Sequence, residues 1–262
     1  MRDTPFVLLA LVSALAGCAG TEPTAATATL PVVQAYLYAG EPVTAVRVTS
    51  TVGIGASDTV GVPVNDATVT LARGGVSYAL IASAGDSGYY HYPDTDLVIA
   101  VGDTFDLRVE ALDRVATARA IVPEPPSALT LSDAELVVPT FGGGFDPEDF
   151  TLVARWPNDA GELYFVVTQN IEASPTDIAT PGPRFRFTAP PTAADSAVVI
   201  AFSFTQYGRH RLTLYRVNSE YAALYESRNQ DSRDLNEPAT NLIGGLGVFT
   251  AFSSRSAEFT VR

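Results

Sequence analysis

The chain has 262 residues, of which 47% are hydrophobic and 17% charged, so it is long enough to bury a real core in one or two domains. This balance excludes disordered, collagen-like and coiled-coil chains. The 29 acidic residues outnumber 16 basic residues, all of them arginine, and the net charge is -13. Such a charge repels nucleic-acid phosphates and anionic lipid headgroups, so we expect no nucleic-acid partner.

The first residues have the pattern of a bacterial export signal. Arg2 precedes an uncharged apolar run over residues 6–16. As a helix this run would be about 17 Å long, well short of the roughly 30 Å hydrocarbon core, so it indicates a signal peptide rather than a membrane span. The sequence Leu15-Ala16-Gly17-Cys18 then resembles a lipobox, in which cleavage precedes the cysteine and the cysteine is acylated. We therefore expect residues 1–17 to be a lipoprotein signal peptide.

Cys18 is the single cysteine of the chain, which excludes an intramolecular disulfide. The alternative to lipidation is a lone buried cysteine behind an ordinary signal peptide. Several acyl chains would anchor the protein firmly without a transmembrane helix. Ala19 follows in place of an aspartate that would favour retention at the inner membrane. We expect an exported protein that contacts the membrane through lipidated Cys18 and is anchored in the outer membrane, facing the periplasm or the cell surface.

Residues 18–30 are small and nearly uncharged, which is typical of a flexible tether. Between residues 31 and 122, short segments with period-two alternation are separated by turn-forming residues, and this pattern predicts a β-sandwich domain. The expected strands are Val32 to Tyr38, Val43 to Ser50, Ala67 to Ala72, Val76 to Ile81, Gly88 to Tyr92, Thr104 to Glu110 and Val115 to Val122.

The prolines that begin at Pro123 interrupt this pattern and predict a linker over residues 123–139. Residues 140–262 are expected to form a second β-rich domain. Its strands are predicted at Phe150 to Trp156, Glu162 to Gln169, Arg184 to Thr188, Ser196 to Thr205, His210 to Val217, Leu246 to Phe252 and Glu258 to Val261. One helix is predicted near residues 219–230, where Tyr221 and Tyr225 share a face that we expect to pack on the second sheet.

Several segments together are similar to one protein family. They are residues 31–42, 64–71, 88–90, 102–109 and 238–249, the last of which has the pattern Asn-x-x-Gly-Gly-x-Gly-x-Phe. With the lipobox, their order and spacing resemble the domain of unknown function 4249 family, lipidated envelope proteins of Bacteroidota and their relatives. The residues that match the closing motif are Asn241, Gly244, Gly245, Gly247 and Phe249.

The resemblance implies a prealbumin-like or immunoglobulin-like first domain, a β-rich second domain and no assigned activity. Family members are often encoded beside TonB-dependent outer-membrane receptors, which implies an accessory role in uptake with such a receptor as partner. No cofactor is implied.

Catalytic constellations are not evident in the sequence. Ser87 lies in a Gly-Asp-Ser-Gly run like that of a chymotrypsin-like nucleophile, but the base histidine should precede it and the first histidine is His91. That run is better explained as a turn. His91 and His210 fall in different predicted domains, and one cysteine with two histidines does not supply a zinc site. We therefore assign no catalytic residue and expect no enzymatic activity.

Two binding features remain candidates. Acidic residues at loop tips suit calcium, although their spacing is not that of an EF-hand and solvated turns are the commoner explanation. The calcium candidates are Asp86, Asp94 and Asp96, with Asp146, Glu148 and Asp149 in a second loop. Aromatic residues could instead form a platform for sugar or peptide. These residues are Tyr89, Tyr90, Tyr92 and Trp156, with Phe141 and Phe145.

Together these observations predict a lipid-anchored outer-envelope protein of two β domains. We expect a non-enzymatic binding or accessory subunit of a TonB-dependent uptake system. The alternatives are a structural or adhesive surface module and a hydrolase that uses paired carboxylates, whose separation depends on the fold and not on sequence spacing.

Overall fold

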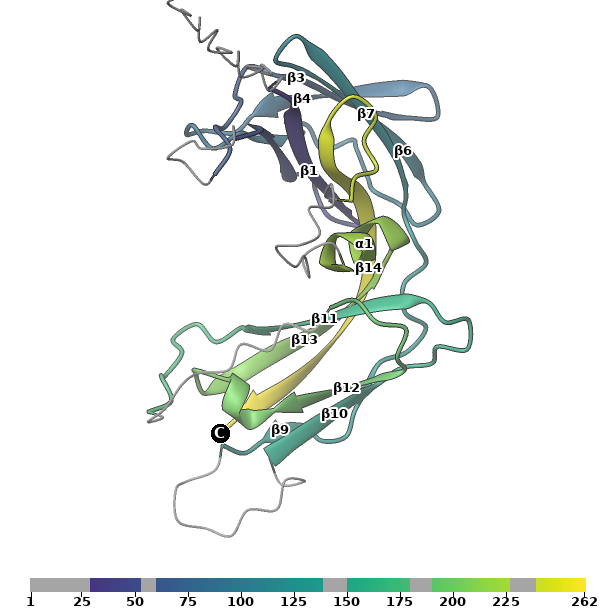
Figure 1. Ribbon diagram of the computed structural model, residues 1–262. Coiled ribbons are helices and arrows are strands. Elements are labelled where there is room, and N and C mark those ends of the chain that lie inside the picture. Colours follow the sequence, from purple (N-terminus) through teal and green to yellow (C-terminus); the bar gives the residue numbers. More distant parts are fainter. Residues whose placement is uncertain (1–28, 53–59, 139–149, 180–189, 227–238) are drawn as a thin grey trace, which may run out of the picture.

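The computed structural model describes residues 29–52, 60–138, 150–179, 190–226 and 239–262. The described chain is mainly β-strand with a single α-helix, which confirms the predicted class. Two lobes lie one above the other and are joined by a long strand that runs through both (Figure 1). Cys18, the predicted signal peptide and the strand predicted at Arg184 to Thr188 lie outside the described residues.

The first lobe is a curved sheet around one hydrophobic core. Its order is β14-β1-β2-β5-β4-β3-β6-β7. Alternation explains the core: in β6, Phe105, Leu107 and Val109 point inward and the residues between them are exposed. The strands are β1 (Pro31–Tyr38), β2 (Ala45–Ser50), β3 (Thr68–Arg73), β4 (Val76–Ala82), β5 (Tyr89–His91), β6 (Thr104–Ala111), β7 (Arg114–Ile121) and β14 (Leu246–Val261).

The second lobe is built on the other half of β14. There β14 pairs with β13, β13 pairs with β11, and β9 pairs with the end of β14. A separate three-stranded sheet of order β12-β10-β8 shares the second core with these strands. The elements are β8 (Thr130–Leu131), β9 (Glu135–Leu136), β10 (Thr151–Arg155), β11 (Leu163–Asn170), β12 (Ser196–Ile200), a 3-10 turn (Ala201–Ser203) and β13 (Gly208–Val217).

Strand β14 differs from the prediction of two strands at Leu246 to Phe252 and Glu258 to Val261. It is one strand of 16 residues that pairs in parallel with β1 and then antiparallel with β13. The residues between Phe252 and Glu258 are mostly polar and exposed, so they carry no period-two signal. Their strand conformation is imposed by pairing with β13, which the sequence does not reveal.

The predicted boundary at residues 123–139 does not describe the packing. Leu242, Phe249 and Ala251 belong to the first core, although the prediction assigns all of residues 140–262 to a second domain. The predicted linker also contains β8 and β9, which pair with β10 and β14. The C-terminal segment therefore joins both cores.

The family motif closes the first lobe. Ile243 pairs with Thr117 of β7, so the last strand of the curved sheet meets the chain just before β14. Gly247 lies against β1 with a φ of +106°, and a Cβ there would be 2.0 Å from the carbonyl oxygen of Val33. Only glycine allows this approach. The Asn241 side chain donates to the carbonyl oxygen of Phe249 (2.7 Å) and accepts from its N–H (2.9 Å).

The helix α1 (Ser219–Glu226) begins within the predicted range, and residues 227–230 lie outside the described residues. It covers β14 between the two lobes (Figure 1). In the described part of the chain, no helix has the length and apolar character needed to cross a membrane.

Candidate binding site

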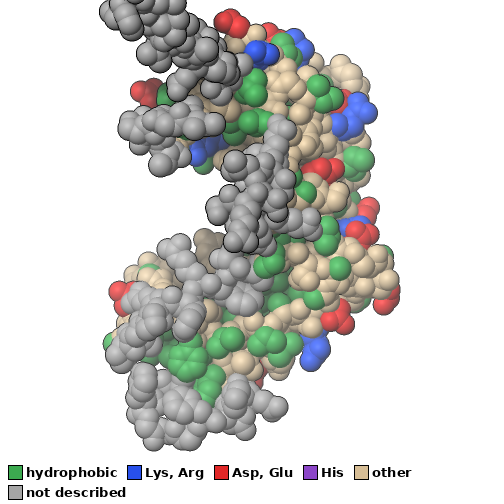
Figure 2. Space-filling model, in the orientation of Figure 1, with side chains coloured by type: hydrophobic (Ala, Val, Ile, Leu, Met, Phe, Trp, Pro, Cys, Tyr) green, Lys and Arg blue, Asp and Glu red, His purple; other side chains and the backbone are tan. Residues whose placement is uncertain are grey.

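An aromatic cluster lies at the junction of the two lobes. In β1 the odd residues Val33, Ala35 and Leu37 enter the first core, so Tyr36 and Tyr38 point to the opposite face of the sheet. Phe252 of β14 is the direct neighbour of Tyr38. The space-filling view shows that the molecule is hollowed between its lobes (Figure 2).

The rings of this cluster contact one another in a continuous chain. Tyr38 stacks on Phe252 with ring centroids 5.2 Å apart, and Tyr215 of β13 meets Tyr38 edge to face at 5.9 Å. Tyr221 of α1 meets Phe252 edge to face at 4.9 Å and Phe165 of β11 at 6.0 Å. These are favourable geometries for aromatic pairs. The cluster therefore ties β1, β14, β13, β11 and α1 together.

The tyrosine face of α1 packs on both lobes. Tyr221 contacts Tyr36 of β1 as well as Phe165, and its hydroxyl lies 3.3 Å from that of Tyr225. The expected packing on the second sheet is present through Phe165 of β11, and the face also contacts the first lobe through Tyr36, because α1 covers β14 where that strand passes between the cores.

A small pocket opens among these rings. Its volume is about 230 Å³. The lining is Tyr38, Phe165, Val167, Tyr215, Tyr221 and Phe252. The described residues provide no hydrogen-bond partner for the hydroxyls of Tyr38 and Tyr215, so these two phenols can serve a bound molecule.

Burial raises the pKa values of the three tyrosines that line the pocket. Burial, reinforced by the neighbouring Tyr215, raises the pKa of Tyr38 to about 12. Burial also raises the pKa of Tyr215 and of Tyr221, and for Tyr221 the hydrogen bond with Tyr225 adds to the effect. All three phenols are neutral near pH 7, as an unperturbed tyrosine also is. They suit stacking and hydrogen bonding rather than proton transfer.

A larger groove lies elsewhere, on the exposed face of β3, β6 and β7, with a volume of about 660 Å³. Its floor is made of short side chains such as Ala72 and Ala118, and Arg119 is held by both carboxylate oxygens of Asp106 (2.7 and 3.1 Å). Arg108 and Arg119 of this groove are exposed and paired with Glu110 and Asp106, whereas the Oε2 atom of Glu220 in its lining is buried without a hydrogen-bond partner among the described residues. We assign binding to the aromatic pocket instead, because its lining is largely aromatic and carries phenol hydroxyls.

The aromatic platform predicted from the sequence is not formed. Tyr90 is buried in the first core, where its hydroxyl donates to the Val64 carbonyl, and Trp156 is buried in the second core. Tyr92 packs against the first core, and Tyr89 is 41% exposed beneath Arg47. Phe141 and Phe145 lie outside the described residues. The residues do not form one platform because the two cores bury Tyr90 and Trp156 separately, and the sequence does not show which core each aromatic side chain enters.

The calcium prediction is not supported by the geometry. Among the residues that the structure describes, no three acidic, histidine or cysteine side chains gather into a possible metal site. Asp96 accepts a hydrogen bond from the Tyr92 hydroxyl at 2.8 Å, and Asp86 and Asp94 do not join it in a cluster. Asp146, Glu148 and Asp149 lie outside the described residues.

The histidines occupy separate places, as the sequence suggests. His91 lies on β5, where its Nδ1 is 2.9 Å from the Ser83 hydroxyl. His210 is buried between Phe204 and Phe259 in the second lobe, and burial lowers its pKa. The Ser87 hydroxyl donates to the carbonyl of Gly85, which is the turn expected there.

The pocket residues were missed as a site, although a signal was present. Tyr36 and Tyr38 alternate with the core residues of β1, which places them on the opposite face. What the sequence could not show is that β13 and β11 bring Tyr215 and Phe165 beside them, because that depends on the continuous course of β14.

The family motif does not line the pocket: of the lining residues, Phe252 lies nearest to it in sequence, three residues after Phe249 on β14. No curated protein matches the chain at a significant level. The family model described as "Domain of unknown function (DUF4249)" matches residues 21–258, which include the closing motif, the pocket and both cores except Phe259 and Val261. The chain therefore belongs to the DUF4249 family.

Proposed function

We propose that this protein is a lipid-anchored outer-envelope protein that serves, without catalysing a reaction, as a binding or accessory subunit of a TonB-dependent uptake system. The observation that carries the proposal is Cys18, the single cysteine, placed directly after a short apolar run and two small residues. Residues 19–30 then act as a tether between the lipid and the first strand.

The aromatic pocket supports the binding role. Small-molecule sites are concave, mostly apolar and equipped with a few polar groups, and this pocket combines hydrocarbon faces with phenol hydroxyls. It is built on paired strands and not on loops, so its shape is held before a ligand arrives. The phenols of Tyr38 and Tyr215 are neutral at pH 7 and can donate and accept hydrogen bonds, which suits recognition of a bound molecule.

Co-purification from crosslinked envelopes tests the proposal. The tagged wild-type protein should recover a TonB-dependent receptor, and the Cys18→Ser variant should lose that receptor because it is no longer held at the membrane. The Tyr89→Ala variant is the matched control, since Tyr89 is exposed on β5 and is not part of the pocket lining. Reproducible recovery of the wild-type protein without any receptor would refute the accessory role.

A further inference from the structure

The aromatic pocket continues into an exposed sheet face in the second lobe. We call this surface the outer face: it is formed by the residues of β11, β13 and β14 that point away from the second core. Cross-strand neighbours point to the same side of an antiparallel sheet, so the strand register defines three rows. The rows are Phe165, Tyr215 and Ser254, then Val167, Thr213 and Ser256, then Gln169, Arg211 and Glu258.

The chemistry changes along the outer face. The first row carries the aromatic rings that line the pocket. The second row is small and hydroxylated, and the Thr213 and Ser256 hydroxyls lie 3.0 Å apart. The third row carries amide, guanidinium and carboxylate groups. From Tyr215 to Arg211 the strands advance by about 13 Å, which matches a short chain of sugar rings.

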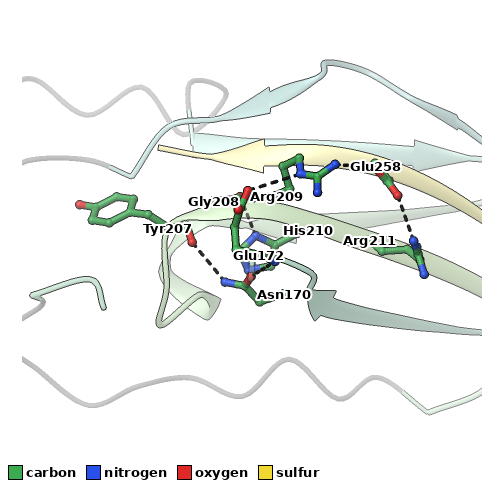
Figure 3. A network of polar contacts seen from close by, with 8 residues as sticks. All are labelled: Asn170, Glu172, Tyr207, Gly208, Arg209, His210, Arg211 and Glu258. Carbon is green, nitrogen blue, oxygen red and sulfur yellow. Dashed lines mark hydrogen bonds and ion pairs between the residues drawn. The ribbon is translucent and has the colours of Figure 1, made fainter. Parts of the chain in front are cut away.

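The charges on this surface balance each other. Arg211 donates to a carboxylate oxygen of Glu258 at 3.1 Å, and Arg209 lies 3.9 Å from the other oxygen of the same carboxylate (Figure 3). Glu172 completes the network by accepting from the backbone N–H of Arg209 at 2.9 Å. Two arginines thus face two glutamates, and the surface favours a neutral ligand over a charged one.

The backbone N–H and C=O groups of β13 are already hydrogen-bonded to the neighbouring strands. β13 is paired on both sides, with β11 and with β14, so the outer face offers side chains and no open strand edge at its centre. An extended peptide could add as a strand only along the β11 edge, and would find no backbone partner across the outer face itself. A polyhydroxylated molecule needs only hydroxyl, amide and charged side chains together with an aromatic face.

We infer that the outer face binds a neutral oligosaccharide, with one sugar ring stacked in the pocket on Tyr215 and the following rings hydrogen-bonded by Thr213, Ser256 and Gln169. This inference rests on the proposed binding function and specifies the class of its ligand.

Titration calorimetry of the full protein in detergent tests this inference with neutral α- and β-linked trisaccharides, namely maltotriose, cellotriose and xylotriose. At least one should bind. Tyr215→Ala should weaken binding about tenfold or more by removing the stacking surface, and Gln169→Ala and Thr213→Val about threefold to tenfold each by removing a hydrogen bond. Gln169 is exposed and Thr213→Val is nearly isosteric, so neither change should disturb folding.

Tyr89→Ala is again the matched control and should bind like the wild type. Lack of binding by all three sugars would overturn the inference, even if a receptor still co-purifies and the proposed function stands. Equal binding by wild type and all three outer-face variants would also overturn it, because the sugar would then occupy another site. Binding of an unstructured peptide at the same face, in place of sugar, would refute the assigned ligand class.

Discussion

Replacing Gly247 by alanine should destabilise the protein in two ways, by straining a backbone with positive φ and by a steric clash with β1. Gly247 has a φ of +106°, and its added Cβ would lie 2.0 Å from the backbone oxygen of Val33. Val33 is fully buried and is the direct partner of Gly247 between β1 and β14. The clash cannot be relieved by rotating a side chain, so the two strands must move apart.

The magnitude follows from the two terms. A left-handed conformation costs a residue with a Cβ about 1–2 kcal/mol. Disturbing the buried pairing should raise the total loss to about 3–5 kcal/mol, a large part of a typical stability of roughly 5–15 kcal/mol. Gly40→Ala is the matched control, because Gly40 has a φ of +78° and nothing within 4 Å of its added Cβ. It should show only the conformational cost.

Urea unfolding of the three proteins, followed by tyrosine and tryptophan fluorescence, provides the measurement. Gly247→Ala should lower the midpoint well beyond Gly40→Ala. Equal losses in the two variants would refute the claim that close contact between β14 and β1 requires glycine in the motif.

Three further changes test other parts of the account. Asn241→Ala should lower the free energy of unfolding in urea by about 2–4 kcal/mol, because it leaves the buried N–H and carbonyl of Phe249 without partners. A loss below about 0.5 kcal/mol, the usual effect of a surface substitution, would contradict this. Burial lowers the pKa of His210 below its usual 6.5, so acidification through pH 6.5 protonates this histidine in the unfolded chain before it does so in the folded one. The wild type should therefore lose more stability than His210→Gln between pH 8 and pH 5.5, and equal losses in the two proteins would contradict this. Burial raises the pKa of Tyr38 to about 12, so this tyrosine ionises in the unfolded state first as the pH rises above 10. Tyr38→Phe should therefore lose less stability than the wild type between pH 10 and 12, and an identical loss in both proteins would contradict this.

Alternation predicted the strands of the first lobe well. β1, β4 and β6 follow the expected ranges within one residue at each end, because buried hydrophobic residues recur at every second position. β8 and β9 were missed because two residues are too few to show a period. The long course of β14 was missed because residues 253–258 are polar or small, and their strand conformation follows from pairing.

The candidate site depended on the same unpredicted pairing. Tyr36, Tyr38, Tyr221 and Tyr225 could each be placed on a strand or helix face from the sequence. Their contact with Tyr215 and Phe165 could not, since it requires β14 to pair with β1 and β13 in succession. Aromatic residues close in sequence, such as Tyr90 and Tyr89, were instead divided between the core and the surface by the pleat.

The most direct test of the central claim is the intact mass of the protein extracted from the outer membrane. Lipid anchoring predicts a chain that begins at Cys18 and carries acyl groups, and it predicts that Cys18→Ser abolishes this species and releases the protein from the membrane fraction. A mature chain that begins at another residue, or one with a free thiol at Cys18 and unchanged membrane association of Cys18→Ser, would contradict the account.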